Sequence, residues 1–398
     1  MKVLVLSHMY PSSFNEVAGI FVHEQVKALI KKGVEVRVIS PIPWTPFPIN
    51  RIKGKWRKYS QVPSRAIWDD VEVFYPRYLT FPRSWFFASS GKRMYRGIEE
   101  MIERIYQEFP FDLIHAHVAL PDGYAAMLLA QKYQKPLVVT IHGQDLQQTV
   151  HRNTKCRCAL NLVFDYASQV VLVSNKLKYL AEEFFDCREK LTVIPNGVDL
   201  GKVSAPELED LPKRERTVTL LSVSYLISRK GIDINLAALQ RLCSKYPWLH
   251  YLVVGDGPLE NKLKEMAASL GLDDYVEFLD RQPHDRVMQY MANCDIFTLP
   301  SWDEAFGVVY IEAMAHGKPV IGCQGEGIED FVEHGKTGML VKPRDVDSLV
   351  EALDFLLSHP EEAKAMGERG RKLVLENYTW EKNAEKTMEV YSSVLGEK

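Results

Sequence analysis

The sequence lacks the features that mark several large classes of protein. Its 398 residues contain no run that approaches the roughly 20 apolar residues of a membrane-spanning helix. Among the six cysteines, only Cys156 and Cys158 lie close together, and no CxxC or mixed Cys/His spacing appears, so we expect no metal site. The net charge of −3 argues against nucleic-acid binding. The apolar run after Met1 is too short for a signal peptide, and we therefore expect a cytoplasmic protein.

Two common nucleotide-binding signatures are also missing. The stretch "VVGDGP" at 253–258 has neither the Lys and Ser/Thr of a P-loop nor the GxGxxG spacing of a dinucleotide site. We interpret it as a turn that ends a buried strand, with glycines that can still approach a ligand. No short-period repeat is found either, which excludes a solenoid.

What the sequence does contain is a regular alternation of β-rich runs and helical patterns. Strands are predicted at 2–7, 34–40, 112–118, 136–143, 169–174, 190–195, 217–224, 249–257, 275–280, 294–301, 318–323 and 338–343. Helices are expected between them, for instance at 21–32, 91–108, 122–133 and 175–184. Apolar strands that alternate with helices are typical of parallel sheets covered on both faces. The sequence therefore predicts an α/β protein with two doubly wound, Rossmann-like domains.

The boundary between these domains is expected near residues 196–216. That segment combines Asn-Gly, Pro and dense charge, which indicates a linker. The first domain would span 1–197 and the second 198–379. A last helix at about 380–396 can pack against either domain, because its pattern alone does not place it.

Ligands of doubly wound sheets bind beyond the carboxyl ends of the strands, so residues at those ends are the candidates. His142 ends a buried strand and precedes a glycine; it either faces the ligand or is a hydrogen-bonded core histidine. His117 has a similar position. Gly19 precedes a helix, whose N-terminus attracts anions, although a plain turn is an equal alternative. Arg229 and Lys230 lie in a strand-to-helix turn, where they suit a diphosphate or form a solvated loop.

The segment "EAFGVVYIEAMAHGKPVIG", Glu304 to Gly322, places two glutamates on an apolar stretch. A helix is expected to start near Gly307 or Val308, so the backbone N–H groups of residues 307–309 (Gly307, Val308 and Val309) can hold a diphosphate. Glu304 in the loop and Glu312 one turn into the helix can accept hydrogen bonds from sugar hydroxyls. A helix cap explains Glu304 equally well, but a solvated position explains Glu312 poorly because its neighbours are apolar.

Residues 51–98 mix basic and aromatic side chains. The eleven basic residues are Arg51, Lys53, Lys55, Arg57, Lys58, Arg65, Arg77, Arg83, Lys92, Arg93 and Arg96, against three acidic ones, Asp69, Asp70 and Glu72, which gives 11 − 3 = +8. The aromatic residues include Trp56, Tyr59, Trp68, Phe74, Tyr75, Tyr78, Phe81, Trp85, Phe86 and Phe87. This composition fits a surface that meets anionic lipid headgroups or an acidic acceptor. A loop-rich insertion with its own small core is an equal alternative.

Several of these stretches, in this order, resemble the retaining GT-B glycosyltransferases of family 4. They are the Gly19 loop, "TIHGQD", "IPNGVD", "LISRKGID", "GDGP", "LPSWDEAFGVVYIEAMAHGKPVIG", "GEGIEDFVEHGKTGMLV" and "YTW". The resemblance covers nearly the whole chain. It implies two domains that face a central cleft, with the last helix, about 380–398, crossing back to complete the first domain.

The resemblance also implies roles for individual residues. Glu304 would contact the donor sugar and Glu312 the ribose, while Lys230 and the backbone at 307–309 would bind the diphosphate of a nucleoside diphosphate sugar, expected to be UDP-linked. His142 matches a histidine beside the donor sugar. Tyr225 stands where the family often has an arginine. Either Arg229 supplies the second cation, or the diphosphate relies on Lys230 and the backbone alone.

The expected activity is metal-independent, retaining transfer of a sugar to a hydroxyl acceptor. A lipid-linked or glycan acceptor for surface polysaccharide is expected on the first domain near His117, with peripheral contact of 51–98 to the inner face of the cell membrane. A sugar-nucleotide epimerase, a phosphorylase and a non-catalytic nucleotide-sugar-binding subunit are the alternatives.

Overall fold

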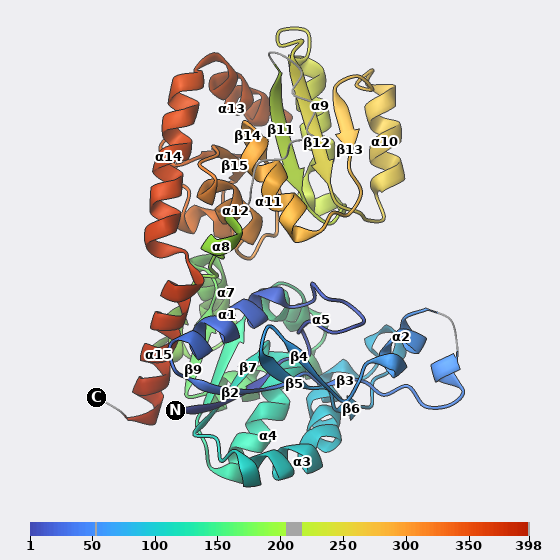
Figure 1. Cartoon of the computed structure of the whole chain (residues 1–398), viewed down its shortest axis with the longest axis vertical. Helices are drawn as coiled ribbons and strands as arrows, with labels where there is room; N and C mark the ends of the chain where they lie inside the picture. The colour runs from blue at the N-terminus through green and yellow to red at the C-terminus, as the bar shows by residue number, and fades with distance from the viewer. Residues whose placement is uncertain (52–53, 204–216, 397–398) are drawn as a thin grey trace. The chain divides into compact units, whose positions relative to one another are not determined.

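The computed structural model describes residues 1–51, 54–203 and 217–396, without the side chains of residues 49 and 55. Two compact units make up the chain (Figure 1). The N-terminal unit comprises Met1–Asn196 and Trp380–Lys398, and the C-terminal unit comprises Gly197–Thr379. Most of the expected linker, residues 204–216, lies outside the described residues, as do Lys53 and the last two residues of the predicted final helix.

The N-terminal unit is built on an eight-stranded sheet in the order β10-β9-β8-β7-β1-β2-β5-β4, with β3 and β6 paired separately. Its strands are β1 (Lys2–Leu6), β2 (Glu35–Ile39), β3 (Ile42–Pro43), β4 (Arg65–Trp68), β5 (Val71–Phe74), β6 (Arg77–Tyr78), β7 (Leu113–His117), β8 (Leu137–Ile141), β9 (Gln169–Leu172) and β10 (Leu191–Val193). Only the β4–β5 pair is antiparallel among the described strands. The apolar runs on β1, β7 and β8 are fully buried because helices cover both faces.

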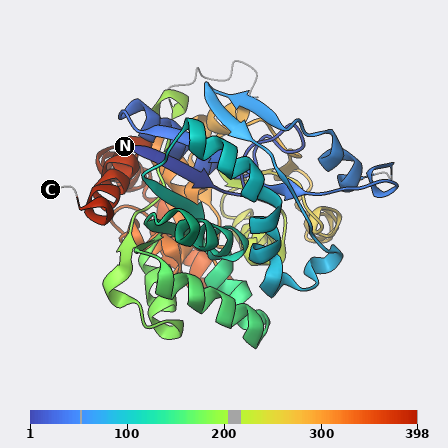
Figure 2. The same ribbon diagram turned by 90° about the horizontal axis from the view of Figure 1, so that it is seen from below.

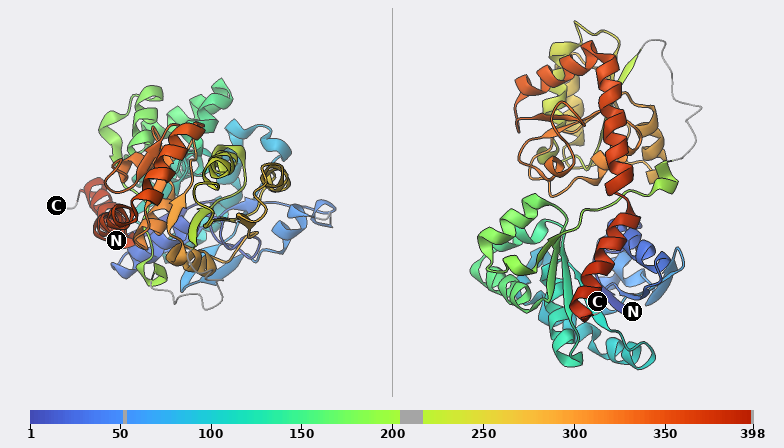
Figure 3. Two further views of the ribbon diagram at one scale, coloured as in Figure 1. Left: turned by 90° about the horizontal axis from the view of Figure 1, so that it is seen from above. Right: turned by 90° about the vertical axis from the view of Figure 1, so that its left-hand side faces the viewer.

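Helices of the N-terminal unit separate into two layers. They are α1 (Ile20–Lys31), α2 (Lys55–Gln61), α3 (Ser90–Glu108), α4 (Tyr124–Tyr133), α5 (Val150–Arg152), α6 (Thr154–Tyr166), α7 (Asn175–Phe184) and α15 (Trp380–Leu395). Helix α3 packs on α4 and α4 on α6, and this helical face is seen from below in Figure 2. Helix α15 lies beside α1 (Figure 3, right), where Gln25 donates a hydrogen bond to Asn383 at 2.7 Å. Helix α15 therefore packs as part of the N-terminal unit.

The C-terminal unit contains a six-stranded parallel sheet in the order β13-β12-β11-β14-β15-β16. Its strands are β11 (Val218–Val223), β12 (Leu249–Val254), β13 (Val276–Phe278), β14 (Ile296–Thr298), β15 (Val320–Cys323) and β16 (Met339–Val341). Its helices are α8 (Leu200–Val203), α9 (Ile232–Leu242), α10 (Glu260–Ser269), α11 (His284–Asn293), α12 (Val308–Ala315), α13 (Val346–Ser358) and α14 (Pro360–Asn377). The chain winds outward from β11 in both directions, which makes the β11/β14 boundary the topological switch point.

The structure confirms the α/β prediction of two doubly wound, Rossmann-like sheets. Each of the twelve ranges predicted as strands contains one strand. The interpretation of 51–98 as an insertion with its own small core is wrong. Strands β4 and β5 extend the main sheet, and Val62, Val71, Val73 and Tyr75 join the core beneath α1 and α15. Strands β3 to β6 had not been predicted, because they are short and half-exposed.

Candidate active site

The carboxyl ends of β11 and β14 bring two loops together at the switch point of the C-terminal unit. After β11 the chain makes a 3₁₀ turn, Ser228–Lys230, and ends it at Gly231 with φ +67°. A Cβ at Gly231 would lie 2.5 Å from the carbonyl oxygen of Pro300, so only glycine allows this turn to pack on the loop after β14. The close approach places Lys230 beside Glu304.

Lys230 and Glu304 form an ion pair, with 2.5 Å between Nζ and Oε2. Both side chains are largely buried, with exposed fractions of 14% and 13%. Ser301 Oγ donates a second hydrogen bond to the same carboxylate oxygen, at 3.2 Å. Burial alone would raise the pKa of the Glu304 carboxyl. Lys230, together with Arg229 and Ser301, outweighs burial, and the pKa lies below its ordinary value. The site therefore holds a fixed negative and a fixed positive charge.

The loop that carries Glu304 is fixed by contacts that the sequence does not reveal. The Glu326 carboxylate, which is buried, accepts hydrogen bonds from the backbone N–H groups of Asp303 (3.0 Å) and Glu304 (2.7 Å). Gly327 N–H donates to the Glu304 carbonyl at 3.2 Å. Arg229 donates from Nη1 to the Asp303 carbonyl at 2.9 Å. The structure thus places Arg229 on the loop backbone, and its contact with a diphosphate stays a prediction.

Helix α12 begins at Val308, with Gly307 as its N-cap at φ +89°. A Cβ at Gly307 would lie 2.5 Å from a ring carbon of Tyr310, which is buried and held by Ser301 and the Leu299 carbonyl. The first helical turn, which includes Val309, offers N–H groups that have no partner within the helix, together with the positive end of the dipole. Such a helix start suits an anion, and phosphate binding at residues 307–309 stays a prediction.

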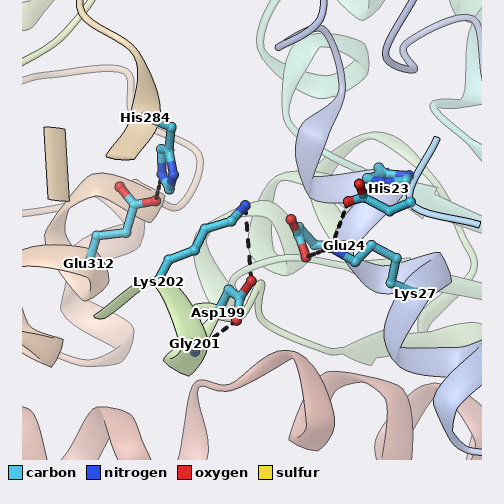
Figure 4. Close-up of polar contacts among 9 residues, drawn as sticks. His23, Glu24, Lys27, Asp199, Gly201, Lys202, His284 and Glu312 are labelled. Carbon is cyan, nitrogen blue, oxygen red and sulfur yellow. Dashed lines mark hydrogen bonds and ion pairs between the residues drawn. The ribbon is translucent and has the colours of Figure 1, made fainter. Parts of the chain in front are cut away.

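Glu312 lies one turn further along α12 and is paired with His284, the first residue of α11. His284 Nε2 and Glu312 Oε1 are 2.9 Å apart (Figure 4). The hydrogen bond to Glu312 raises the pKa of His284 above its ordinary value, against the effect of burial. The glutamate side chain is 14% exposed. The pairing explains how an apolar segment carries a carboxylate, and His284 was missed by the sequence analysis.

In the N-terminal unit the switch point lies between β1 and β7, and the predicted histidines gather there. His117 Nδ1 and His142 Nε2 are 3.0 Å apart, and the two rings stack at 5.3 Å. Burial lowers the pKa of His142 to about 3 and that of His117 well below its ordinary value. Both rings are therefore neutral near pH 7, and one donates an N–H to the other. Phe21, at the start of α1, packs on His142 at 4.5 Å between ring centroids.

The sequence analysis also missed two buried aspartates of the N-terminal unit, Asp122 and Asp145. His8, just after β1, contacts Asp122 through its backbone N–H (3.0 Å) and through Nδ1 (2.5 Å). Burial lowers the pKa of His8, but Asp122 outweighs it and the net shift is upward. Asp145 accepts the N–H groups of residues 119 and 120, and burial raises its pKa to about 7. No local pattern signals these pairs, because their members lie far apart in the sequence.

Gly19 caps α1 with φ +62°. A Cβ there would lie 2.1 Å from the Met9 carbonyl oxygen, so the close approach of two backbone segments already requires glycine. The phosphate-binding role of Gly19 stays a prediction. Within residues 1–51, 54–203 and 217–396, no group of three or more His, Cys, Asp or Glu side chains could hold a metal ion. In the same residues no helix is long and apolar enough to cross a membrane.

Comparisons with known proteins agree with this architecture. Residues 18–202 match the family described as Glycosyltransferase Family 4, and residues 205–373 match Glycosyl transferases group 1. TuaC of Bacillus subtilis strain 168, whose name assigns it to teichuronic acid biosynthesis as a glycosyltransferase, is 30% identical over 362 residues, 89% of this chain and 88% of TuaC.

Solved structures of similar fold include two with full-length correspondence. Sucrose-phosphate synthase from Thermosynechococcus elongatus gives a TM-score of 0.80 at 22% identity and covers 100% of both chains. Anabaena HepE in complex with UDP gives 0.75 at 19% identity and covers 99% of this chain and 100% of HepE. The chain therefore belongs to the group 1, family 4 glycosyltransferases and has their GT-B fold.

Proposed function

We propose that the chain is a retaining glycosyltransferase that moves a sugar from a nucleoside diphosphate sugar, expected to be UDP-linked, to a hydroxyl group of a glycan or lipid-linked acceptor. The observation that carries the proposal is the buried Lys230–Glu304 pair beside the start of α12. One cation and a ring of backbone N–H groups suit a diphosphate, and one carboxylate suits sugar hydroxyls. The UDP complex of HepE, a protein of the same fold, supports the choice of nucleotide. The name of TuaC supports a cell-surface polymer as the product.

Lys230 is held by Glu304, so a bound diphosphate competes with the carboxylate for the ammonium group. When Lys230 turns to the phosphate, a Glu304 oxygen is released to accept a hydroxyl of the donor sugar. Glu312, fixed by His284, accepts a ribose hydroxyl. The backbone N–H groups of Gly307, Val308 and Val309 bind the phosphate oxygens.

In the proposed reaction the bond between the anomeric carbon and the β-phosphate oxygen breaks, and negative charge develops on the phosphate. Lys230 and the start of α12 stabilise this charge in a site from which water is largely excluded. The acceptor oxygen forms its bond to the anomeric carbon from the same face, and the departing phosphate takes the acceptor proton. The anomeric configuration is retained. No metal ion takes part in the proposed step.

The acceptor is proposed to bind at the carboxyl edge of the N-terminal sheet, near His117. The neutral His117–His142 pair can donate and accept hydrogen bonds without bringing a charge, which suits an uncharged hydroxyl. His142 is proposed to lie beside the donor sugar. Residues 51–98 are proposed to contact a membrane surface, in keeping with their positive charge.

Substitution of Glu304 tests the proposal. Glu304→Gln keeps the shape of the side chain but removes its charge, and we expect kcat/KM for acceptor-dependent UDP release to fall at least about 100-fold. UDP binding, measured by calorimetry, should persist and serves as the fold control. The anomeric proton signals of donor and product should show the same configuration.

Two of the alternatives give results that differ from those expected for a transferase. Sugar release without acceptor indicates an epimerase, and UDP binding without turnover in the unmodified protein indicates a non-catalytic subunit. Unchanged transfer by Glu304→Gln and by Lys230→Ala would show that the reaction takes place elsewhere. Glu260→Gln, which removes an exposed carboxylate paired with Lys264, is the matched control and should leave transfer within about two-fold of the unmodified protein.

A further inference from the structure

A hollow of about 440 Å³ opens on the N-terminal unit between β6 and α3. Its lining includes three arginines, Arg77, Arg93 and Arg96, and three large side chains, Trp44, Tyr78 and Leu79. We call it the arginine hollow. It contains no Asp or Glu among its lining residues. Three positive charges therefore share one concave surface without a lining carboxylate.

The fold brings the three guanidinium groups together by close packing of α3 on β6. A Cβ at Gly97 would lie 2.6 Å from the Arg77 carbonyl oxygen, so glycine at this helical position allows the approach. Arg93 and Arg96 lie three residues apart on α3 and thus on one face of the helix. Arg77 extends from β6 toward the same space.

Two of these arginines are held by neutral acceptors. Arg77 donates from Nη2 to the Val62 carbonyl. Arg93 donates from Nε to the Leu79 carbonyl at 3.0 Å, and from Nη1 to Ser89 Oγ at 2.6 Å. Burial lowers the pKa of both groups. Among the described residues none of the three arginines forms an ion pair. An anion would supply the missing charge.

The rim of the arginine hollow is apolar and exposed. Trp44 is 52% exposed and Leu79 43%, and both line the hollow. Phe86, whose carbonyl accepts a hydrogen bond from Arg93, is 70% exposed, and its neighbour Trp85 is 58% exposed. Large apolar side chains rarely gather at a surface around a cationic centre without a partner. Aromatic groups beside arginines are typical of surfaces that meet the headgroup region of a bilayer.

We infer that the arginine hollow binds the phosphate of a membrane lipid headgroup, with Trp44 and Leu79 in contact with the apolar part of the same lipid. Guanidinium groups match phosphate oxygens in geometry and charge, and the apolar rim favours a lipid over a free anion. This inference rests on the proposed membrane contact of residues 51–98 and assigns it to one site. Binding needs neither donor nor acceptor sugar, so it can be tested apart from transfer.

Vesicle flotation tests the inference with the full-length protein. Vesicles of phosphatidylglycerol mixed with phosphatidylcholine should bind the unmodified protein, and phosphatidylcholine alone should bind it more weakly. Arg96→Gln should lower the partition coefficient about five-fold. The Arg96 side chain makes no hydrogen bond or ion pair with the described residues, so its replacement should leave the fold intact, as the melting temperature will show. Trp44→Ser should weaken binding by a similar factor.

Arg104→Gln is the matched control, because it removes one positive charge from the same helix at an exposed position that is paired with Glu100. It should change partition by less than about two-fold. Equal losses for Arg96→Gln and Arg104→Gln would mean diffuse attraction and would overturn the site. Displacement from vesicles by millimolar inorganic phosphate, together with no effect of Trp44→Ser, would identify a free-anion site and overturn the lipid assignment. If sugar transfer fails while these results hold, the proposed transfer reaction is wrong and the lipid site stands.

Discussion

The two sheets of this protein present opposite kinds of polar group at equivalent places. Both wind outward from a switch point, and in both the carboxyl ends of the central strands carry the candidate residues. In the C-terminal unit these residues are charged and paired, as Lys230 is with Glu304. In the N-terminal unit His117 and His142 are neutral and bonded to each other.

The difference comes from what surrounds the groups rather than from residue type alone. His284 and His142 are both histidines, yet their pKa values shift in opposite directions. His284 has a carboxylate partner, which stabilises its charged form, whereas His142 has only neutral neighbours in a buried site. A site rich in fixed charge suits a phosphate-bearing donor, and a neutral one suits hydroxyl groups. The comparison thus supports a division of donor and acceptor binding between the two sheets.

Removal of Lys230 should produce the largest effect on the charged site. Lys230→Ala leaves the largely buried Glu304 carboxylate without its ion-pair partner, which should lower the free energy of unfolding by roughly 3–5 kcal/mol. The loss of the cation should also lower kcat/KM by about 100- to 1,000-fold. Urea denaturation and acceptor-dependent UDP release measure the two effects separately.

A double substitution separates folding from catalysis. Lys230→Ala combined with Glu304→Ala removes both charges, so most of the lost stability should return while transfer stays low. Lys264→Ala breaks an exposed pair with Glu260 and should cost less than about 1 kcal/mol. If the double variant is as unstable as Lys230→Ala, the pair is not the source of the instability.

The sequence revealed Lys230, Glu304 and Glu312, but it missed the residues that hold the two glutamates in place. Glu304 and Glu312 stand out because they occupy a short apolar segment whose helix start can be read locally. Their supports, Glu326 and His284, come from other loops and helices, and nothing near them in the sequence marks the contact. Pairs of this kind depend on tertiary packing, which periodicity and composition do not encode.

The same limit applies to the fold. Long apolar strands such as β1 and β8 were predicted correctly, because burial on both faces leaves a continuous apolar run. Strands β4 and β5 form a hairpin at the sheet edge, where residues are half-exposed and the pattern is weak. Its turn uses Asp69 and Asp70 at positive φ, a conformation that aspartate tolerates but that is less telling than Asn-Gly.

The N-cap glycines of α1 and α12 give a second comparison between the two units, and their replacement should have intermediate effects on stability. Gly19 and Gly307 both have positive φ, but an added Cβ would meet backbone at Gly19 and an aromatic ring at Gly307. Backbone cannot move away as a ring can, so Gly19→Ala should cost about 3 kcal/mol or more and Gly307→Ala about 2 kcal/mol. Urea denaturation of each unliganded variant measures the difference.

Two other glycines provide controls for backbone strain alone. Gly33 in the N-terminal unit and Gly271 in the C-terminal unit also have positive φ, and an added Cβ at either would find no atom within 4 Å. For each alanine variant, the free energy of unfolding should fall by about 1 kcal/mol. If Gly19→Ala loses no more stability than Gly33→Ala, the close approach to Met9 does not require glycine at position 19.

The histidines test the comparison between the two sheets most directly. NMR titration should place the pKa of His284 above its ordinary value and that of His142 near 3. His284 then contributes stability that is present below about pH 6.5 and is lost as pH rises through its raised pKa. His142 contributes stability that is present above about pH 6.5 and is lost as pH falls toward 3. The two histidines thus act in opposite directions.

Asp145 also titrates in this range. Its pKa of about 7 means that its protonation adds to the stability of the folded protein as pH falls. Glutamine variants of His142 and His284 therefore separate the contribution of each histidine from that of Asp145. Between pH 6 and 5 the unmodified protein should lose up to about 1.4 kcal/mol more stability than His142→Gln, the limit for one proton. Near neutral pH, the unmodified protein should lose stability as His284, paired with Glu312, is deprotonated, and His284→Gln should not show this loss. The same pH dependence in both variants would mean that the two sheets do not differ in charge, and a division of binding based on charge would no longer hold.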